Sequence, residues 1–382
     1  MVERNYVLAV VIGPRSVRKR EETVMFQHLA HFNSIFATSN FPHDAKESYY
    51  VHVEVENLLL NPLSALLLRR TAPYSTTSFM RLRNLEESLK QADVINCIET
   101  FSFVSYQCAK IAKRLRKKLV TSVFETIPHN LIHYFPPYVR NTKAVLKQTD
   151  IFIAYTKKAA EYLRAFSVPK ERIKVIYPGI DLRIFYPPSR RSGNEKFRIL
   201  FVSGYFNPEK GLSILLSAFL QLCEEHQNVE LWICVGHPLG KDAPVAFAYA
   251  KRYPIKIISH VKHDEMAIIY RQCDVLCLPS YDRMKFGLKI WEEQFGFVLV
   301  EAMACGLPIV ATNCGAIPEI IGPQNLIVQQ KSAEDLYVAF KKIIEDDSFS
   351  RYLASANRDR AERLFDIEKQ RINLDKTLYE AL

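Results

Sequence analysis

Residues 292–306 read EEQFGFVLVEAMACG, an apolar run preceded by a pair of glutamates and interrupted by a third. Two strand-like segments flank it, DVLCLPS (274–280) before and LPIVATN (307–313) after. The run FVLVEAMAC is therefore predicted to be a helix, ended by Gly306, because glycine is the commonest residue just beyond a helix C-terminus. A strand, a helix and a second strand in this order are typical of a parallel sheet.

The same alternation extends over the chain. The predicted strands cover residues 6–12, 49–55, 93–98, 118–124, 150–155 and 173–177 in the first half, and 197–203, 229–236, 255–261, 274–280, 307–313 and 325–329 in the second. Helical patterns separate most of them. Near-continuous apolar strands belong to parallel sheets that are covered on both faces. The sequence thus predicts an α/β fold with two Rossmann-like, doubly wound domains that face a cleft.

A segment rich in Pro, Gly and polar residues, 177–196, marks the expected seam. We predict a first domain over 1–180, a second over 181–347, and C-terminal helices over 348–382 that pack back toward the first domain. Ligands of doubly wound sheets bind beyond the carboxyl ends of the strands, so the functional site is expected there.

Composition limits the location and the partners. The chain has 382 residues, 48% of them hydrophobic, and its longest apolar run (58–68) is too short to cross a bilayer. The N-terminus lacks the pattern of a signal peptide, and the eight cysteines form no CxxC pair, so we expect a cytoplasmic protein without a metal cluster.

Positive charge is concentrated in the first half. Residues 1–180 hold 26 Lys and Arg against 15 Asp and Glu, a net of +11, whereas 181–382 hold 25 against 26, a net of −1. The densest clusters are 15–20 and 110–118. The second is interpreted either as a solvated helix end or as a surface for anionic lipid or an anionic acceptor. No nucleic-acid-binding motif accompanies the charge.

Glu293 and Glu301 flank a loop whose glycine, Gly296, allows close approach of a ligand to the backbone. The N–H groups at a helix start bind phosphate, and carboxylates accept hydrogen bonds from sugar hydroxyls. The two glutamates are therefore suited to two sugars of a nucleotide sugar. The alternative is that Glu301 is an ordinary early-helix acid and Glu293 an exposed loop residue.

Four segments, 175–188, 203–219, 264–280 and 292–322, together resemble the retaining glycosyltransferases of family 4 (GT-B fold, glycosyl transferases group 1). The resemblance implies a first domain that binds the acceptor and a second that binds the nucleotide sugar. It further implies transfer of a hexosyl group, with retention, to a hydroxyl of a glycan, lipid-linked or small-molecule acceptor. No strong general base is needed, because the leaving diphosphate can take the acceptor proton. Neither a cofactor nor a metal is expected.

The resemblance also implies roles for individual residues. Lys210 would neutralise the diphosphate and Glu293 would hold the hydroxyls of the donor sugar, so these two are the catalytic candidates. Glu301 would bind the ribose. The full set of predicted donor-binding residues is Gly204, Tyr205, Lys210, Glu293, Phe295, Gly296, Phe297, Val298 and Glu301.

Some positions depart from the family pattern. Tyr205 stands where the family usually has a phosphate-binding arginine, and the longer segment after Ser280 carries Arg283, Lys285 and Lys289, one of which we expect to replace it.

On the acceptor side Glu125 and His129 are the candidates, and only Gly13 stands where the family has a glycine-rich loop. These departures keep open a relative that hydrolyses sugar nucleotides or does not transfer. A dinucleotide oxidoreductase is excluded by the lack of a G-x-G-x-x-G run. The expected partners are a nucleotide sugar, a glycan or lipid-linked acceptor and, peripherally, the anionic inner face of a membrane; nucleic acid is not among them.

Overall fold

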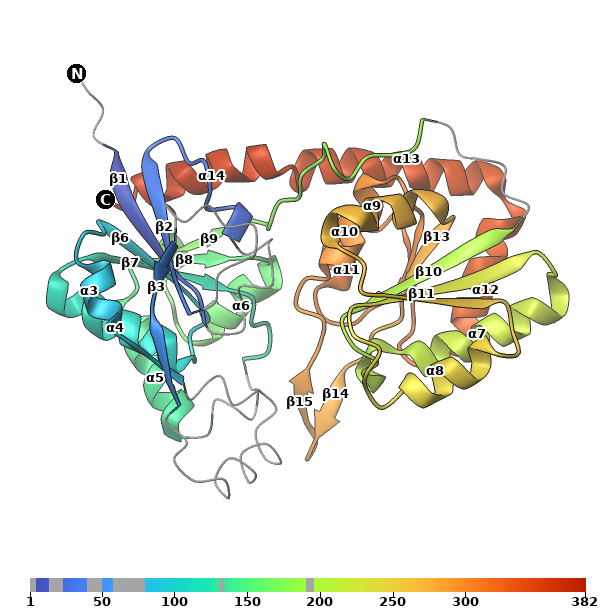
Figure 1. Ribbon diagram of the computed structural model, residues 1–382, viewed down its shortest axis with the longest axis horizontal. Coiled ribbons are helices and arrows are strands. Elements are labelled where there is room, and N and C mark those ends of the chain that lie inside the picture. The colour runs from blue at the N-terminus through green and yellow to red at the C-terminus, as the bar shows by residue number, and fades with distance from the viewer. Residues whose placement is uncertain are drawn as a thin grey trace. The chain divides into compact units, whose positions relative to one another are not determined.

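The computed structural model describes two compact α/β units, each with its own parallel sheet (Figure 1). The described residues are 5–13, 23–39, 50–57, 80–128, 130, 134, 136–189 and 196–382. The first unit comprises Met1–Gly179, Met284–Trp291 and Ile367–Leu382, and the second comprises Ile180–Arg283 and Glu292–Asp366. The predicted fold class of two parallel-sheet α/β domains is confirmed.

The first unit has a seven-stranded sheet in the order β3-β2-β1-β6-β7-β8-β9, with every pair parallel. Its strands are β1 (Tyr6–Val11), β2 (Phe32–Thr38), β3 (Tyr50–His52), β6 (Val94–Ile98), β7 (Lys118–Val123), β8 (Ile151–Ala154) and β9 (Ile173–Val175). Helices α3 (Leu85–Leu89), α4 (Phe103–Leu115), α5 (Pro136–Gln148), α6 (Lys157–Ala165) and α14 (Ile367–Tyr379) belong to the same unit. Ser102 caps α4 by accepting a hydrogen bond from the Ser105 N–H at 3.0 Å.

Two details of this sheet differ from the sequence prediction. Strand β2 was not predicted, because Asn33 and Ser34 interrupt its apolar residues. The segment 49–55, predicted as one strand, is divided between β3 and β4 (Glu54–Asn57), and β4 pairs antiparallel with β5 (Met80–Arg83) in a separate two-stranded sheet. Local apolar pattern cannot distinguish these cases, because pairing partners are set by the tertiary fold.

The second unit has a six-stranded parallel sheet in the order β12-β11-β10-β13-β16-β17. Its strands are β10 (Phe197–Ser203), β11 (Val229–Val235), β12 (Ile255–Ser259), β13 (Val275–Leu278), β16 (Ile309–Thr312) and β17 (Leu326–Val328). In order of sequence within the unit this is 3-2-1-4-5-6, the Rossmann order. The strand order reverses between β10 and β13, and such a switch point is where this architecture binds its ligands.

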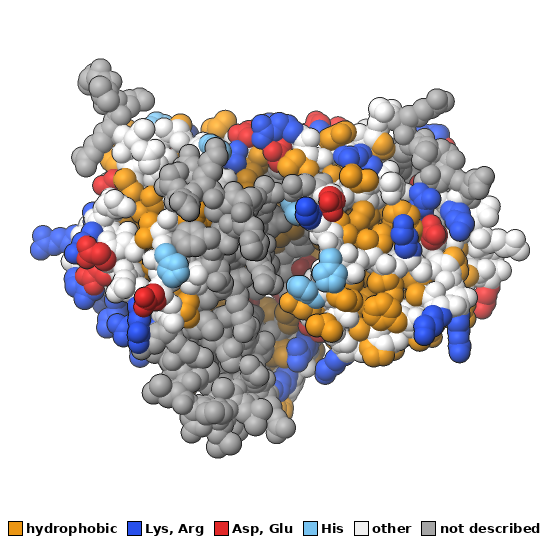
Figure 2. All heavy atoms as spheres, viewed as in Figure 1, with side chains coloured by type: hydrophobic (Ala, Val, Ile, Leu, Met, Phe, Trp, Pro, Cys, Tyr) orange, Lys and Arg blue, Asp and Glu red, His pale blue; other side chains and the backbone are white. Residues whose placement is uncertain are grey.

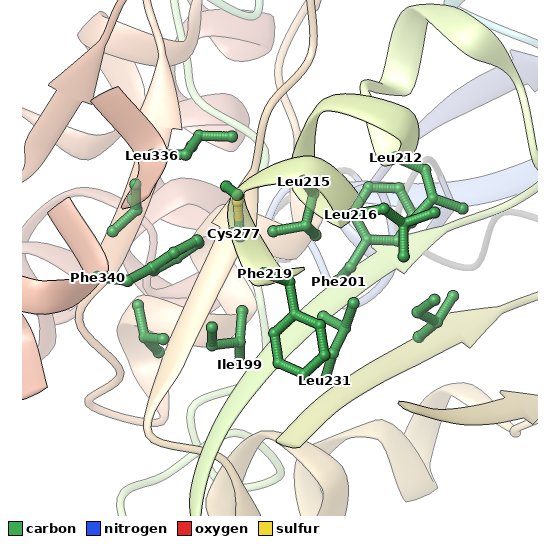
Figure 3. Close-up of a cluster of buried hydrophobic side chains, with 14 of the residues drawn as sticks. Ile199, Phe201, Leu212, Leu215, Leu216, Phe219, Leu231, Cys277, Leu336 and Phe340 are labelled. Carbon is green, nitrogen blue, oxygen red and sulfur yellow. The ribbon is translucent and has the colours of Figure 1, made fainter. Parts of the chain in front are cut away.

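Helices cover both faces of the second sheet (Figure 1). They are α7 (Leu212–Glu225), α8 (Ala243–Ala250), α9 (His263–Gln272), α10 (Phe297–Ala304), α11 (Ile317–Ile321), α12 (Ala333–Glu345) and α13 (Asp347–Leu364). Figure 3 shows the core on the α7 face, where Leu216 lies beside Phe201 of β10, Phe219 lies beside Leu231 of β11, and Phe340 of α12 belongs to the same cluster. These side chains are buried, so the strand ends above them are held rigidly.

Residues 283–291 form a small antiparallel sheet of β14 (Arg283–Lys285) and β15 (Leu288–Trp291), a hairpin inserted between β13 and α10. By its contacts the segment Met284–Trp291 belongs to the first unit. In the part of the chain that the structure describes, no helix combines the length and apolar character needed to span a membrane.

Candidate functional site

The predicted donor-binding residues gather at the switch point of the second sheet. Gly204 follows β10 directly, and Ser280 follows its neighbour β13 by two residues. Glu293 lies in the loop that connects the hairpin to α10. The carboxyl ends of two adjacent parallel strands thus supply backbone and side chains to one place, as the architecture predicts.

An ion pair joins Lys210 and Glu293, which are 83 residues apart in sequence. The Lys210 Nζ lies 2.7 Å from Oε2 of Glu293, and the Ser280 hydroxyl donates to the same oxygen at 3.1 Å. The side chains of Lys210 and Glu293 are 24% and 11% exposed. Glu293 is therefore a largely buried, hydrogen-bonded carboxylate, and the alternative of an exposed loop residue does not hold.

A glycine keeps the backbone of Glu293 in place. Gly315 has φ +58°, and a Cβ at this position would lie 2.0 Å from the carbonyl oxygen of Glu293. Its neighbour Ala316 donates its N–H to that oxygen at 2.8 Å. Only glycine allows this close approach of the two loops, so the segment after β16 fixes where the Glu293 carboxylate points.

A second glycine fixes Lys210. Gly211, with φ +78°, ends the short 3-10 helix Pro208–Lys210 and begins α7, and a Cβ there would lie 2.0 Å from the carbonyl oxygen of Pro279. The contact holds the lysine loop against the residue that precedes Ser280. Gly204 differs, since a Cβ added to it would have no atom within 4 Å. Space for a ligand therefore lies beside Gly204.

The loop 295–298 forms the start of α10. Gly296 is the N-cap residue with φ +79°, and Phe297 and Val298 are partly exposed in the first turn. The side chain of Phe295 is buried, with its ring 6.0 Å from that of Phe365. Phe295 can thus offer a ligand only its backbone, whereas the turn after Gly296 presents backbone N–H groups of the kind that bind phosphate.

Glu301 has two partners on α9. The Tyr270 hydroxyl donates to its Oε2 at 2.6 Å, and Nε2 of His263 lies 3.0 Å from its Oε1. Burial, and then the charge of Glu301, raise the pKa of Tyr270 well above its usual value, so the tyrosine remains a hydrogen-bond donor. This buried network excludes the alternative of an ordinary early-helix acid at Glu301. Neither α9 partner was predicted from the sequence.

Tyr205 presents a half-exposed ring where the family pattern has an arginine. The ring stacks on His237 at 5.1 Å between centroids, and His237 meets His260 edge-on at 6.0 Å. These three residues follow the carboxyl ends of β10, β11 and β12 in turn. Neither histidine was among the predicted site residues, although His237 directly follows the predicted strand 229–236 and His260 lies near the end of the predicted strand 255–261.

The cations that we expected to replace the arginine lie on the hairpin. Arg283 is exposed, while Lys285 and Lys289 belong to the segment assigned to the first unit. Their participation in donor binding remains a prediction.

The acceptor-side candidates are placed only in part. Glu125 is fully buried after β7, and its Oε1 accepts hydrogen bonds from the backbone N–H groups of Thr126 and Ile127 at 3.0 and 2.8 Å. This carboxylate therefore stabilises its own turn. His129 lies outside the described residues. Among the residues that are described, no three His, Cys, Asp or Glu side chains form a group able to hold a metal, and the expectation that none takes part stays untested.

Two family models match this chain and together cover most of it. Residues 27–184 match the model described as Glycosyltransferase Family 4, and residues 188–360 match that described as Glycosyl transferases group 1. The boundary between the two matches falls beside the Gly179–Ile180 division of the structure.

Curated relatives agree with these matches at low identity. The chain is 28% identical over 240 residues to an MMP alpha-(1->4)-mannosyltransferase of Mycolicibacterium hassiacum, covering 62% of this chain and 55% of that protein. It is 25% identical over 249 residues to a D-inositol 3-phosphate glycosyltransferase of a Nocardioides species, covering 59% and 52%. The chain spans about half the length of the curated relatives it matches.

Solved structures show the same fold over nearly the whole chain. Anabaena HepE in complex with UDP and glucose superposes with a TM-score of 0.73 at 16% identity, covering 98% of this chain and 100% of that one. Sucrose-phosphate synthase from Thermosynechococcus elongatus gives 0.73 at 18% identity, with 98% of each chain covered. With both halves matched by its models, the chain belongs to glycosyltransferase family 4, the group 1 glycosyl transferases with two Rossmann-like domains.

Proposed function

We propose that the protein is a retaining glycosyltransferase that moves a hexosyl group from a nucleotide-diphosphate sugar to a hydroxyl of a glycan, lipid-linked or small-molecule acceptor. The observation that carries the proposal is the Lys210–Glu293 pair at the switch point, with Ser280 on the same carboxylate oxygen. The curated relatives are named for sugar transfer, to an inositol phosphate in one case, which supports the same class.

The two hydrogen bonds to Glu293 leave one of its oxygens for a substrate. Within the described part of the chain both fall on Oε2, from Lys210 and Ser280. A carboxylate oxygen has two acceptor positions, so Oε1 is suited to the hydroxyls of a donor sugar. Lys210 meanwhile keeps its ammonium 2.7 Å from Oε2, the other oxygen of the carboxylate. A diphosphate that binds Lys210 would therefore form an ion pair, while the Glu293 carboxylate would keep its own ion pair with the same ammonium.

In the proposed mechanism the substrates exchange the bonds and the proton, and the protein stabilises the charge that develops. The bond between the anomeric carbon and the diphosphate oxygen breaks as the acceptor oxygen attacks from the same face. The acceptor proton passes to the departing diphosphate, so no protein base is required. Lys210 and the N–H groups that follow Gly296 stabilise the charge that develops on the diphosphate. Glu301, which accepts a hydrogen bond from the Tyr270 hydroxyl, is assigned to the ribose hydroxyls.

A hydrolytic or non-transferring relative is the second candidate, and Tyr205 is the observation that favours it. The aromatic ring removes one expected cation from the diphosphate site. Loss of a phosphate-binding arginine lowers the stabilisation of the leaving group, although the histidine stacked on Tyr205 offers a polar ring in its neighbourhood.

Thermal unfolding with UDP, GDP, ADP and their common sugars tests the donor site. At about 100 times Kd, a ligand adds about 2.7 kcal/mol, which raises Tm by roughly 5–10 °C for domains of this size. We expect a shift with one base that Lys210→Ala removes and Lys341→Ala keeps. Lys341 is the matched control because it pairs with Glu225 at the same 2.7 Å on an exposed face of the second unit. No shift with any nucleotide would overturn the proposed donor class.

Transfer and hydrolysis are separated by following labelled sugar from the donor so identified. Label that appears on an added acceptor supports the transferase, whereas label released only as free sugar supports the hydrolytic candidate. Measuring the anomeric configuration of the product by NMR tests retention, and an inverted product would contradict the same-face mechanism.

A further inference from the structure

The hairpin RMKFGLKIW (283–291) exposes hydrophobic side chains at its tip. Phe286 is 85% exposed, Met284 55% and Leu288 36%. Phe286 and Gly287 both have positive φ, as the two-residue turn of a tight hairpin requires, yet a bulky aromatic residue is disfavoured in that conformation. A Cβ on Gly287 would have no atom within 4 Å. The tip therefore stands in solvent.

The base of the hairpin is fixed, in contrast to the tip. Ile290 is 2% exposed, and the buried side-chain amide of Asn130 donates to its carbonyl oxygen at 3.2 Å. A two-stranded hairpin is only marginally stable by itself, so this anchor in the first unit gives the hairpin its defined position. Phe286 thus lies at the end of the hairpin that is away from the buried core.

The hairpin is also positively charged throughout. Arg283, Lys285 and Lys289 lie between and beside the hydrophobic residues, and residues 283–291 contain no acid. The Lys285 ammonium is 5.4 Å from the centre of the Phe286 ring. Blue and orange side chains lie together where Figure 1 draws β14 and β15 (Figure 2). The first unit, to which the tip belongs, carries the positive excess of the sequence.

We propose that this hairpin docks the protein on an anionic lipid bilayer, with Phe286, Met284 and Leu288 entering the headgroup boundary and the cations meeting lipid phosphates. Exposed aromatic and aliphatic side chains gain free energy by leaving water for this boundary, and neighbouring cations add attraction to anionic lipid.

Other occupants fit this surface less well. A glycan offers hydroxyls that hydrocarbon side chains cannot hydrogen-bond. A second copy of the hairpin would bring three further cations against Arg283, Lys285 and Lys289. The hydrophobic part of the inference is independent of the donor site, because Phe286, Met284 and Leu288 take no part in the proposed chemistry.

Co-sedimentation of the full chain with lipid vesicles tests the proposal. We expect binding to phosphatidylcholine vesicles that contain about 30% phosphatidylglycerol, little binding to phosphatidylcholine alone, and loss of binding at high salt. Phe286→Ser should weaken the binding at least tenfold, since a phenyl ring no longer leaves water. Lys285→Gln should weaken it about fivefold. Tyr352→Ser, at an exposed aromatic residue of α13, is the matched control and should leave it unchanged.

A tryptophan at the tip reports its depth directly. In Phe286→Trp, added anionic vesicles should shift the emission to the blue and brominated lipid should quench it, while Tyr352→Trp should show neither change.

Absence of binding to the anionic vesicles, or equal binding by Phe286→Ser and wild type, would overturn the proposal. Dissociation of a dimer in Phe286→Ser would instead identify a second copy as the occupant. The nucleotide-induced Tm shift should persist in Phe286→Ser and Phe286→Trp, so failure here is distinguishable from failure of the donor site.

Discussion

Replacement of Glu293 by glutamine should separate nucleotide binding from sugar transfer, because the proposed mechanism places the carboxylate between the Lys210 ammonium and the donor sugar. Its Oε2 accepts from the Lys210 ammonium at 2.7 Å. The amide of Glu293→Gln keeps a similar shape but no charge, so the ammonium no longer has the Glu293 carboxylate competing with a diphosphate. We therefore expect tighter binding of the free nucleotide diphosphate and strongly reduced transfer from the nucleotide sugar.

The magnitudes follow from the burial of the pair. Removing one negative charge at contact distance from the ammonium is worth about 1 kcal/mol, or about fivefold in Kd for the nucleotide. Lys210→Ala acts in the opposite direction and should weaken nucleotide binding about 100-fold, as expected for loss of a charged donor to a charged ligand. It also leaves the largely buried Glu293 with Ser280 alone. That costs about 2 kcal/mol, or roughly 4–8 °C in the Tm of a unit of this size.

Isothermal titration of the identified nucleotide and a labelled-sugar transfer assay measure the two quantities. Transfer should fall at least 100-fold in Glu293→Gln, because the carboxylate that holds the donor sugar is lost. Lys341→Ala and Glu225→Gln, at the exposed pair of equal length, should change neither. If Glu293→Gln weakens nucleotide binding as much as Lys210→Ala does, the carboxylate binds the nucleotide itself and the reasoning is refuted.

Three further outcomes are expected. Gly211→Ala should destabilise the second unit by about 2 kcal/mol or more, because its Cβ would overlap the Pro279 carbonyl at a position with positive φ. Gly204→Ala should leave Tm unchanged and weaken nucleotide binding. Equal Tm values for the two variants would contradict the close contact between Gly211 and Pro279. The pKa of Tyr270 is raised in the folded protein, so its contribution to stability is complete below about pH 10 and is lost as the pH rises above that value. Tyr270→Phe should therefore flatten the decline of Tm at alkaline pH. An unchanged decline would exclude the hydrogen bond between Tyr270 and Glu301 as the cause of that decline. Cys223 is partly buried and the other seven cysteines are buried, so in native protein at about pH 8 only Cys223 should alkylate measurably, and rapid labelling of several thiols would contradict this burial.

The fold was predictable because its signal is local and repeated. Each central strand is a short apolar run, and each crossover has a helical pattern, so the α/β class follows from the sequence itself. The glycine after the helix at 297–305 was also readable, since Gly306 has the positive φ expected beyond a helix end. The strand prediction failed at one end of the first sheet. Strand β2 mixes polar with apolar residues, and the segment 49–55 contributes residues to two different sheets.

The sequence predicted the charged residues of the site but not the residues that contact them. The family resemblance gave Lys210, and the glutamates around the Gly296 loop together with that resemblance gave Glu293, but their partners come from elsewhere in the sequence. Ser280, at a strand end, carries no distinctive pattern, and Tyr270 lies in a helix where its ring reads as core. Such partners are set by tertiary packing, which brings α9 beside α10, and no spacing within either helix encodes that contact.

The hairpin illustrates the same limit. Its sequence was recognised as an insertion with three cations, yet the positions of Phe286 and Met284 in solvent depend on the turn and on the Asn130 anchor. Exposed apolar residues are common singly on protein surfaces, so the sequence alone could not separate a tip from a core strand.

The two glutamates at the centre of the site differ in their partners, and this difference supports the division of labour proposed for them. A carboxylate near a diphosphate is stabilised when a cation lies beside it, because like charges at contact distance repel strongly. Glu293 meets this condition through Lys210. Glu301 accepts a hydrogen bond from the Tyr270 hydroxyl and lies 3.0 Å from Nε2 of His263, both on α9. A carboxylate so placed is suited to hydroxyls that lie beyond the phosphates, which is where the ribose of a nucleotide sugar stands.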